Sequence, residues 1–131
     1  MEDKKSYPVD DVKCGDYMVW NVCSQTASTA LVELKDDNTV YMSVKKENTS
    51  TELQELTQGC KGAFYTGGAN LRFEVTIHNA VMPQRGCKSL NGIVDAEARV
   101  VGRTMSLCIE DYNDNDYNDY YITLAAWQKK G

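Results

Sequence analysis

Residues 71–77 read Leu-Arg-Phe-Glu-Val-Thr-Ile, and apolar and polar side chains alternate along the whole stretch. Successive side chains of a β-strand point to opposite faces, so Leu71, Phe73, Val75 and Ile77 would share one face. A helix, with its period of 3.6, would not bring these four residues onto one face. The stretch therefore predicts a strand with one side in a hydrophobic core.

The same alternation, or a run of β-branched and aromatic residues, recurs through most of the chain. It predicts further strands at 17–23, 29–34, 39–44, 94–100, 103–109 and 120–127. Residues typical of turns lie between them at 36–38, 67–68 (expected to form a hairpin turn), 83–86 and 91–92. Short strands joined in this way predict an all-β fold, an antiparallel β-sandwich.

One segment does not follow this pattern. Residues 47–58 offer Ser50 or Thr51 as a helix N-cap, Leu53 and Leu56 at helical spacing, and Gly59 as a stop. The segment is therefore interpreted as a short helix or a long loop. No linker divides the chain, and its 131 residues are interpreted as a single domain, 1–131.

Charge is concentrated in one place. Residues 110–119 hold five of the nineteen acidic residues and no Lys or Arg, so the net charge of −5 comes from this segment. The rest of the chain shows no basic patch of the kind that binds nucleic acid. No apolar run approaches the roughly 20 residues of a membrane-spanning helix. We therefore expect neither nucleic-acid binding nor membrane insertion.

The acidic segment reads Glu-Asp-Tyr-Asn-Asp-Asn-Asp-Tyr-Asn-Asp, and its polar side chains are carboxylates, amides and two phenols. Calcium binds six to eight oxygen ligands from carboxylates, carbonyls and water. Five carboxylates this close repel one another, and a divalent ion would remove that repulsion. The segment therefore predicts a calcium site, because magnesium demands a stricter octahedral geometry.

An EF-hand loop and a solvated acidic loop are two other interpretations of the acidic segment. An EF-hand loop beginning at Asp111 or Asp114 would place Ile122 or Ala125 where a bidentate Glu is required, and its sixth position would lack Gly. The spacing therefore excludes an EF-hand. A solvated acidic loop is the simpler alternative, but the amides between the acids and the apolar strands on both sides favour a metal site.

Five cysteines (Cys14, Cys23, Cys60, Cys87 and Cys108) form no Cys-x-x-Cys pair, which argues against a zinc ribbon. Those at 23 and 108 lie in apolar, strand-like runs, where a buried free thiol is the simplest interpretation. Two disulfides and one thiol would instead fit an exported protein. The charged first five residues indicate a cytosolic or an already processed chain. The location stays open, with an exported or extracellular one slightly favoured.

Residues 110–119 resemble the motif of the calcium-dependent fucose- and mannose-binding bacterial lectins, the fucose-binding lectin II family. The resemblance continues in the apolar strand that ends near Trp127 and in the chain-terminal Gly131, and more weakly in residues 17–26 and 32–39. Residues 45–62 look like an insertion. The resemblance implies a sandwich of about nine strands that binds two adjacent calcium ions, which sugar hydroxyls coordinate directly.

The resemblance also assigns roles by position. The implied metal ligands are Glu110, Asp114, Asp116, Asn118, Asp119, the main-chain carbonyl of Ser24, and the terminal carboxylate of Gly131 reaching calcium in a neighbouring subunit of a homodimer. The implied carbohydrate-binding residues are Asp111, Gln25 and Thr26, together with Asp114 and Asp116 through the metal. Gln25-Thr26 replaces the family's small polar pair, so the sugar preferred among fucose- and mannose-type ligands is left open.

The leading hypothesis is thus a lectin without enzymatic activity. A calcium-stabilised sandwich that binds a protein partner, or has only a structural role, is the alternative. A pair of acids such as Glu110 and Asp119 could imitate a glycosidase, but that chemistry needs one acid kept neutral. Calcium would hold all of these carboxylates ionised, so we expect no catalysis.

Overall fold

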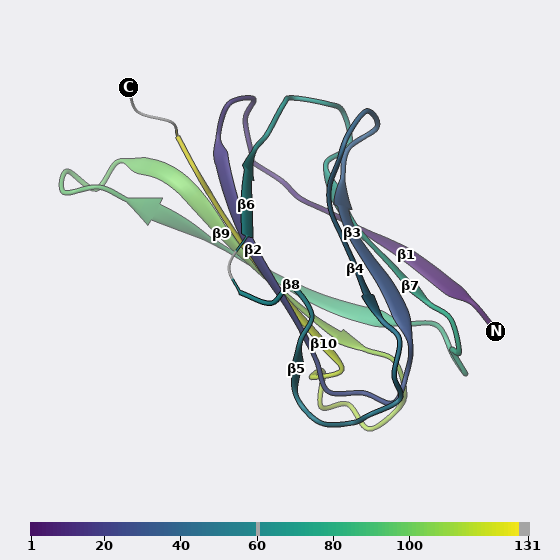
Figure 1. The fold of residues 1–131 in the computed structure, drawn as a ribbon. Helices are drawn as coiled ribbons and strands as arrows, with labels where there is room; N and C mark the ends of the chain where they lie inside the picture. Colours follow the sequence, from purple (N-terminus) through teal and green to yellow (C-terminus); the bar gives the residue numbers. More distant parts are fainter. Residues whose placement is uncertain (60, 129–131) are drawn as a thin grey trace.

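The computed structural model describes residues 1–59 and 61–128, and within them the chain forms two antiparallel sheets packed face to face (Figure 1). This confirms the all-β sandwich, with ten strands where about nine were expected. The strands are β1 (Asp3–Pro8), β2 (Tyr17–Ser24), β3 (Ala30–Lys35), β4 (Val40–Lys46), β5 (Gln54–Glu55), β6 (Lys61–Phe64), β7 (Arg72–Ile77), β8 (Arg85–Val94), β9 (Val100–Glu110) and β10 (Tyr120–Trp127).

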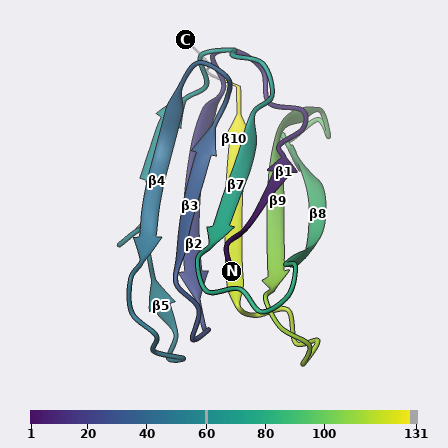
Figure 2. The ribbon, with the colours of Figure 1, turned by 90° about the vertical axis from the view of Figure 1, so that its right-hand side faces the viewer.

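The smaller sheet has the order β1-β7-β3-β4, and its strands lie side by side in that order in Figure 2. The larger sheet has the order β5-β2-β10-β9-β8, and β6 also pairs with β2. β10 is therefore a central strand, held by β2 on one side and β9 on the other along its full length. The β9–β10 connection, which carries the acidic segment, emerges at one end of the sandwich, and the last residues of β10 lie at the other end (Figures 1 and 2).

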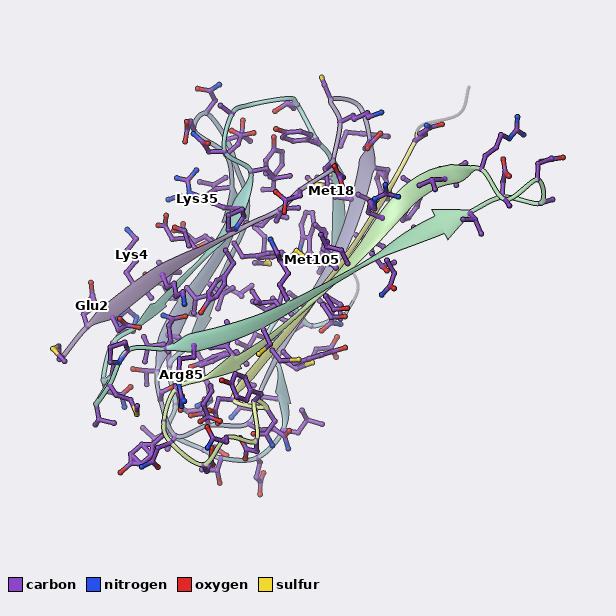
Figure 3. All side chains as sticks on the ribbon, turned by 180° about the vertical axis from the view of Figure 1, so that it is seen from behind. Glu2, Lys4, Met18, Lys35, Arg85 and Met105 are labelled. Atoms are coloured by element: carbon purple, nitrogen blue, oxygen red, sulfur yellow. The ribbon has the colours of Figure 1, made fainter. Side chains whose placement is uncertain are left out.

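The core lies between the sheets and is built from the inward side chains that the alternation predicted. Phe73, Val75 and Ile77 of β7 are essentially buried. Met18 of β2 and Met105 of β9 are buried on the inward face of the larger sheet (Figure 3). Burial of apolar surface, worth roughly 25 cal/mol per Å², is what holds the sheets together.

The predicted strand at 94–100 is wrong, because Val94 ends β8, Val100 begins β9 and residues 95–99 form the turn between them. The Asp95 side chain accepts hydrogen bonds from the backbone N–H groups of Glu97 and Arg99, an arrangement typical of Asp in turns. Val94 and Val100 are more than half exposed because this hairpin extends beyond the sandwich (Figure 1). The alternation here marks no buried face, and residues 91–92, expected to be a turn, continue β8.

The structure decides two other local predictions. Of the two interpretations of the 47–58 segment, the long loop is confirmed and the short helix is wrong; β5 interrupts the loop and pairs Gln54 and Glu55 with the end of β2. Leu53, expected on an apolar helix face, is 68% exposed. Gly67-Gly68 is not a hairpin turn either, because β6 and β7 belong to different sheets and the connection crosses between them.

The sequence reasoning missed β1, β5, β6 and most of β8. Each lies at a sheet edge, and β1 and β8 expose most of their side chains, so no apolar face marks them in the sequence. No helix that could cross a membrane occurs among residues 1–59 and 61–128.

Candidate metal and ligand site

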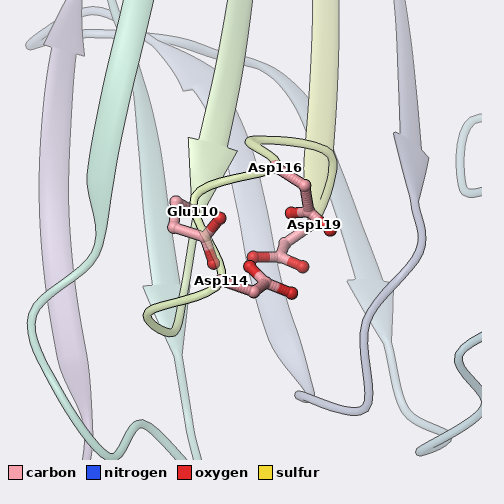
Figure 4. A group of neighbouring side chains, drawn as sticks. All are labelled: Glu110, Asp114, Asp116 and Asp119. Carbon is pink, nitrogen blue, oxygen red and sulfur yellow. The ribbon is translucent and has the colours of Figure 1, made fainter.

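Four carboxylates converge where β9 ends and β10 begins. Ligand oxygens of Glu110, Asp114, Asp116 and Asp119 all lie within 4.8 Å of one another. Figure 4 shows the four side chains turned toward a common centre, with Glu110 at the end of β9 and the others on the loop that follows. These four residues, called here the carboxylate cluster, are four of the five side-chain metal ligands that the sequence predicted.

The strand pair fixes the two ends of the loop. Ile109 of β9 lies opposite Tyr120 of β10, so the nine residues 111–119 must turn back within the width of one strand pair. The buried Glu110 carboxylate organises that turn, because it accepts hydrogen bonds from the backbone N–H groups of Tyr112 and Tyr117, both at 3.1 Å. Glu110 is thus held at the base of the cluster.

Asp119 closes the loop from its other end. Its Oδ2 accepts the backbone N–H of Asp111 at 2.8 Å. Its main-chain carbonyl accepts the N–H of Gln25 at 3.0 Å, which joins the acidic loop to the segment that follows β2. Asp119 is buried whereas Asp114 and Asp116 are exposed, so the cluster has a buried half and an open half.

Crowding of the carboxylates shifts their pKa values. Burial, with the neighbouring Glu110 and Asp111, raises the pKa of Asp119 well above the ordinary aspartate value. Burial would also raise the pKa of Glu110, but hydrogen bonds from Asp119 and the backbone N–H groups outweigh it and lower that pKa. Glu110, burial and Asp116 raise the pKa of Asp114. This repulsion is the kind that a divalent cation relieves.

The donors of the cluster are all carboxylate oxygens, eight in total, with no nitrogen or sulfur among the four residues. Hard oxygen donors in a partly open arrangement are what Ca²⁺ prefers, whereas zinc and copper sites use His and Cys. The residues present therefore fit a calcium ion, and the open side formed by Asp114 and Asp116 leaves room for further ligands.

A pocket of about 570 Å³ opens directly on the exposed half of the cluster. Its lining includes no Lys or Arg among the described residues, so the charged side chains that it presents are all carboxylates: three from the cluster and Asp111. The lining residues are Gln25, Thr26, Ala27, Ser28, Thr51, Ile77, Asn79, Ala80, Val81, Asp111, Tyr112, Asp114, Asp116, Asn118 and Asp119. Three of the four cluster carboxylates and all three predicted sugar-contacting residues thus share one cavity.

Asp111 belongs to a hydrogen-bond network on the pocket wall rather than to the cluster. Its Oδ2 accepts hydrogen bonds from the hydroxyls of Thr26 at 2.6 Å and Ser28 at 2.8 Å. The Ser28 hydroxyl also lies 2.7 Å from the Tyr120 hydroxyl, at the start of β10. The network holds the loop after β2 against the acidic loop and leaves the second carboxylate oxygen of Asp111 outside these contacts.

Lys46, the last residue of β4, is hydrogen-bonded to the pocket wall through Ser28. Its ammonium donates to the carbonyl of Ser28 at 3.0 Å and to that of Asn48 at 2.6 Å. Burial lowers the pKa of Lys46, and the nearby Asp111 carboxylate partly opposes that shift. A buried ammonium with fixed carbonyl partners positions residues 26–28 at the mouth of the pocket.

Arg85 holds the other side of the acidic loop. It begins β8 directly opposite Glu110 and extends toward the loop (Figure 3). Its guanidinium donates to the carbonyl of Tyr112 and to the side chain of Asn115, and it lies 5.9 Å from the ring centre of Tyr117. The sequence reasoning singled out none of Ser28, Lys46 and Arg85, because the contacts that tie each of them to the site come from residues distant in the sequence.

The other three predicted metal ligands, Asn118, Ser24 and Gly131, are not part of the carboxylate cluster. The amide of Asn118 faces the carboxylate of Asp116, with nitrogen-to-oxygen distances of 2.8 and 3.0 Å when its nitrogen is turned inward. Ser24 is buried at the end of β2 and lines a separate cavity of about 230 Å³ that Asn118 also borders. Its hydroxyl has no hydrogen-bond partner among the described residues. Gly131 lies outside the described residues.

No protein-family model matches the chain, and no curated protein matches its sequence. Solved structures do match it. The C-terminal domain of the BC2L-C lectin from Burkholderia cenocepacia superposes with a TM-score of 0.62 at 19% identity, covering 99% of this chain and 100% of that one. The Chromobacterium violaceum lectin CV2L, solved with alpha-methyl-fucoside, and the high-affinity mannose-binding lectin of Ralstonia solanacearum each have a TM-score of 0.57. Their identities are 19% and 18%, and each match covers 95% of this chain and 96% of theirs. The chain therefore has the β-sandwich fold of these bacterial lectins over nearly its whole length.

Proposed function

We propose that this protein is a calcium-dependent lectin of the fucose- and mannose-binding bacterial family. One observation carries the proposal: the exposed half of the carboxylate cluster forms part of the wall of a pocket large enough for a ligand. An acidic cluster that only stabilised the fold would have no need of such a cavity. The lectin fold and the resemblance of residues 110–119 to the family motif support the same conclusion.

In this proposal the cluster holds one or two Ca²⁺ ions. Glu110 and Asp119 supply the buried carboxylates, and Asp114 and Asp116 supply the exposed ones. Asn118 and the Ser24 carbonyl are further ligands implied by the family motif. Bound calcium would supply open coordination positions at which sugar hydroxyls replace water. This matters because a neutral sugar otherwise gains little by exchanging hydrogen bonds with water for hydrogen bonds with protein.

The chain's own residues would then orient the sugar. Asp111 is held by Thr26 and Ser28 through its Oδ2 and would accept a hydrogen bond from a sugar hydroxyl. Gln25 is exposed on the same wall and would contact the sugar at its rim. Two of the similar structures are described as a fucoside complex and a mannose-binding lectin, which supports ligands of the fucose and mannose type.

We propose binding without catalysis. A glycosidase needs one carboxylic acid that stays protonated to donate to the leaving group. Carboxylates that share a divalent cation are held ionised, so none in the cluster could serve as that acid. The similar structures named above are described as lectins.

Isothermal titration calorimetry tests the proposal. Methyl fucoside and methyl mannoside are titrated into the protein first in millimolar calcium and then in excess EGTA. We expect binding in calcium and none after chelation, with restoration when calcium is added back. The alternative is a calcium-stabilised domain that binds a protein or is purely structural. It predicts that chelation lowers only the melting temperature and that no mono- or oligosaccharide on a glycan array binds. That second result would overturn the lectin proposal.

A further inference from the structure

Three cysteines lie in one row across the outer face of the larger sheet. Cys23 of β2 is opposite Tyr121 of β10, Tyr121 is opposite Cys108 of β9, and Cys108 is opposite Cys87 of β8. The neighbours of Cys108 along the strand, Leu107 and Ile109, are fully buried in the core. The side chain between them points away from the interior, and Cys87 is on the same side of the sheet.

All three thiols are free in this structure, but they differ in accessibility: Cys87 is exposed, whereas Cys23 and Cys108 are partly buried. The simple expectation of thiols buried in the core is therefore wrong for Cys23 and Cys108, which lie on the outer side of the sheet. A thiol that faces outward on a sheet can react with a partner on a neighbouring strand.

Cys87 and Cys108 are directly opposite each other on adjacent antiparallel strands. Directly opposite residues in such a pair have Cα atoms about 4.5 or 5.5 Å apart, according to the hydrogen-bond pattern. Disulfides accept Cα separations of about 4.4–6.8 Å, so both cases lie within that range. We propose that Cys87 and Cys108 are a redox-active pair that forms a cross-strand disulfide under oxidising conditions.

The other described cysteines are poor partners for either member of this pair. Cys23 is separated from Cys108 by the whole width of β10, about 9.6 Å for two strand spacings, with Tyr121 between them. Cys14 lies in the loop before β2, beside Gly67. A Cβ added to Gly67 would be 3.0 Å from the sulfur of Cys14. Cys60 is outside the described residues. The sheet register thus selects one pairing where the sequence left the connectivity open.

The chemistry requires an oxidant, for which a small-molecule disulfide such as oxidised glutathione is sufficient. The exposed Cys87 thiolate attacks the glutathione disulfide, forming a mixed disulfide and releasing one glutathione thiolate. The Cys108 thiolate then attacks the Cys87 sulfur and releases the second glutathione. Two protein thiols lose two electrons and two protons in total, and these convert one oxidised glutathione to two reduced molecules.

The bond would tie together the long β8–β9 hairpin near the candidate metal site. It would close a loop of 22 residues, from 87 to 108, whose outer part extends beyond the sandwich (Figure 1). Arg85 and Glu110, which hold the acidic loop, form a cross-strand pair two residues away from it. Constraining a loop of this length in the unfolded chain stabilises the folded state.

Peptide mapping by mass spectrometry tests the pairing directly. The full-length protein is equilibrated with oxidised glutathione, remaining thiols are alkylated, and the digest is analysed without reduction. We expect a cross-linked peptide pair that contains residues 87 and 108 and disappears on reduction. Alkylation of both cysteines, or a bond from either of them to another cysteine, would overturn the proposal.

Thermal melting of matched variants provides a second test. Oxidation should raise the melting temperature of the wild-type protein by about 5–10 °C. Cys87→Ser and Cys108→Ser should each abolish that rise, and Cys23→Ser, a control in the same row, should preserve it. A rise that survives Cys87→Ser, or that is lost in Cys23→Ser, would contradict the pairing.

Discussion

Thr26 and Asp111 are 85 positions apart in the sequence, and a hydrogen bond of 2.6 Å from the threonine hydroxyl to the aspartate Oδ2 joins them. Thr26 follows β2 and Asp111 follows β9, two strands separated by β10 in the larger sheet. The bond therefore connects two of the loops that line the candidate ligand pocket. It couples the wall that would contact a sugar to the loop that would hold calcium.

Thr26→Val removes the hydroxyl while nearly keeping the shape of the side chain. Asp111 loses one of its two fixed donors, and a hydrogen bond to a charged group contributes about 1.5–3 kcal/mol. We expect sugar affinity to fall about tenfold or more, whereas calcium affinity should change less than about threefold because Asp111 lies outside the cluster. Calorimetric titrations with each ligand measure both effects. Thr26→Ser, which keeps the donor, should restore sugar binding, and its failure to do so would argue against this role.

Asp116→Asn removes one charge from the exposed half of the carboxylate cluster. Loss of an outer-shell partner typically weakens a metal site 10–100-fold, so loss of a direct ligand should cost at least about 100-fold in calcium affinity. Calcium titration by calorimetry measures the change. Glu97→Gln, an equal change of charge at the exposed turn between β8 and β9, is the control and should bind calcium as the wild type does. Equal affinities for the two variants would remove Asp116 from the ligand set.

Glu74 predicts a specific dependence of stability on pH. It is buried on β7, and its carboxylate lies 3.0 Å from the ammonium of Lys4 and 3.2 Å from that of Lys35 (labelled in Figure 3). Burial alone would raise the pKa of Glu74, but the two lysines outweigh it and lower the pKa. A lowered folded-state pKa means that the stabilisation is complete above the unfolded value, about 4.3, and is lost as the pH falls through the folded one.

Glu74→Gln should therefore destabilise the protein by about 1–3 kcal/mol at pH 7, and the difference from wild type should shrink below about pH 4. Urea unfolding at pH 7 and at pH 3 measures both values. Glu97→Gln, whose carboxylate is exposed, again serves as the control and should change stability little at either pH. A difference between Glu74→Gln and wild type that is independent of pH would contradict the assigned ion pairs.

Gly68 lies against a buried carboxylate and leaves no room for a methyl group. A Cβ at this position would be 2.3 Å from Cγ of Asp36, whose Oδ1 accepts the backbone N–H groups of Asn38 and Thr39. Gly68→Ala should thus displace Asp36 and destabilise the protein by about 2 kcal/mol. In Gly92→Ala, the new Cβ would be at least 3.3 Å from its neighbours, and stability should change by less than about 1 kcal/mol. Equal unfolding midpoints for the two variants in urea would refute the steric argument.

Strands with one buried face were predictable from the sequence. Residues 17–24 and 120–127 alternate between buried and more exposed side chains because one face of each strand packs on the core, and the alternation is visible without a structure. Residues 72–77 show the same alternation of apolar and polar residues, although Glu74 and Thr76 are buried as well. Residues 94–100 show the same alternation but form the end of a hairpin, with a turn at 95–99, because this hairpin extends beyond the sandwich and no core lies under it. Local pattern cannot distinguish a face that is buried from one that has nothing to pack against.

The candidate site also has a part that the sequence predicts and a part that it does not. Residues 110–119 predict a cation site through composition alone, because carboxylates so close in sequence lie near one another and repel unless a cation lies between them. The hydrogen bonds of Asp111 could not be predicted from the sequence, because its partners Thr26 and Ser28 follow a different strand. Lys46 and Arg85 had no local signal for the same reason.

Which face a core strand buries and which segment concentrates negative charge depend on neighbours along the chain, so both can be predicted from the amino-acid order. The position of β10 between β2 and β9, and that of Cys87 opposite Cys108, depend on contacts between distant segments. Strand order and register are settled by the packing of both sheets on one core, where contacts between distant segments offset the entropy of closing the loops between them. That packing brings Thr26 to Asp111 and so joins two of the loops that line the pocket.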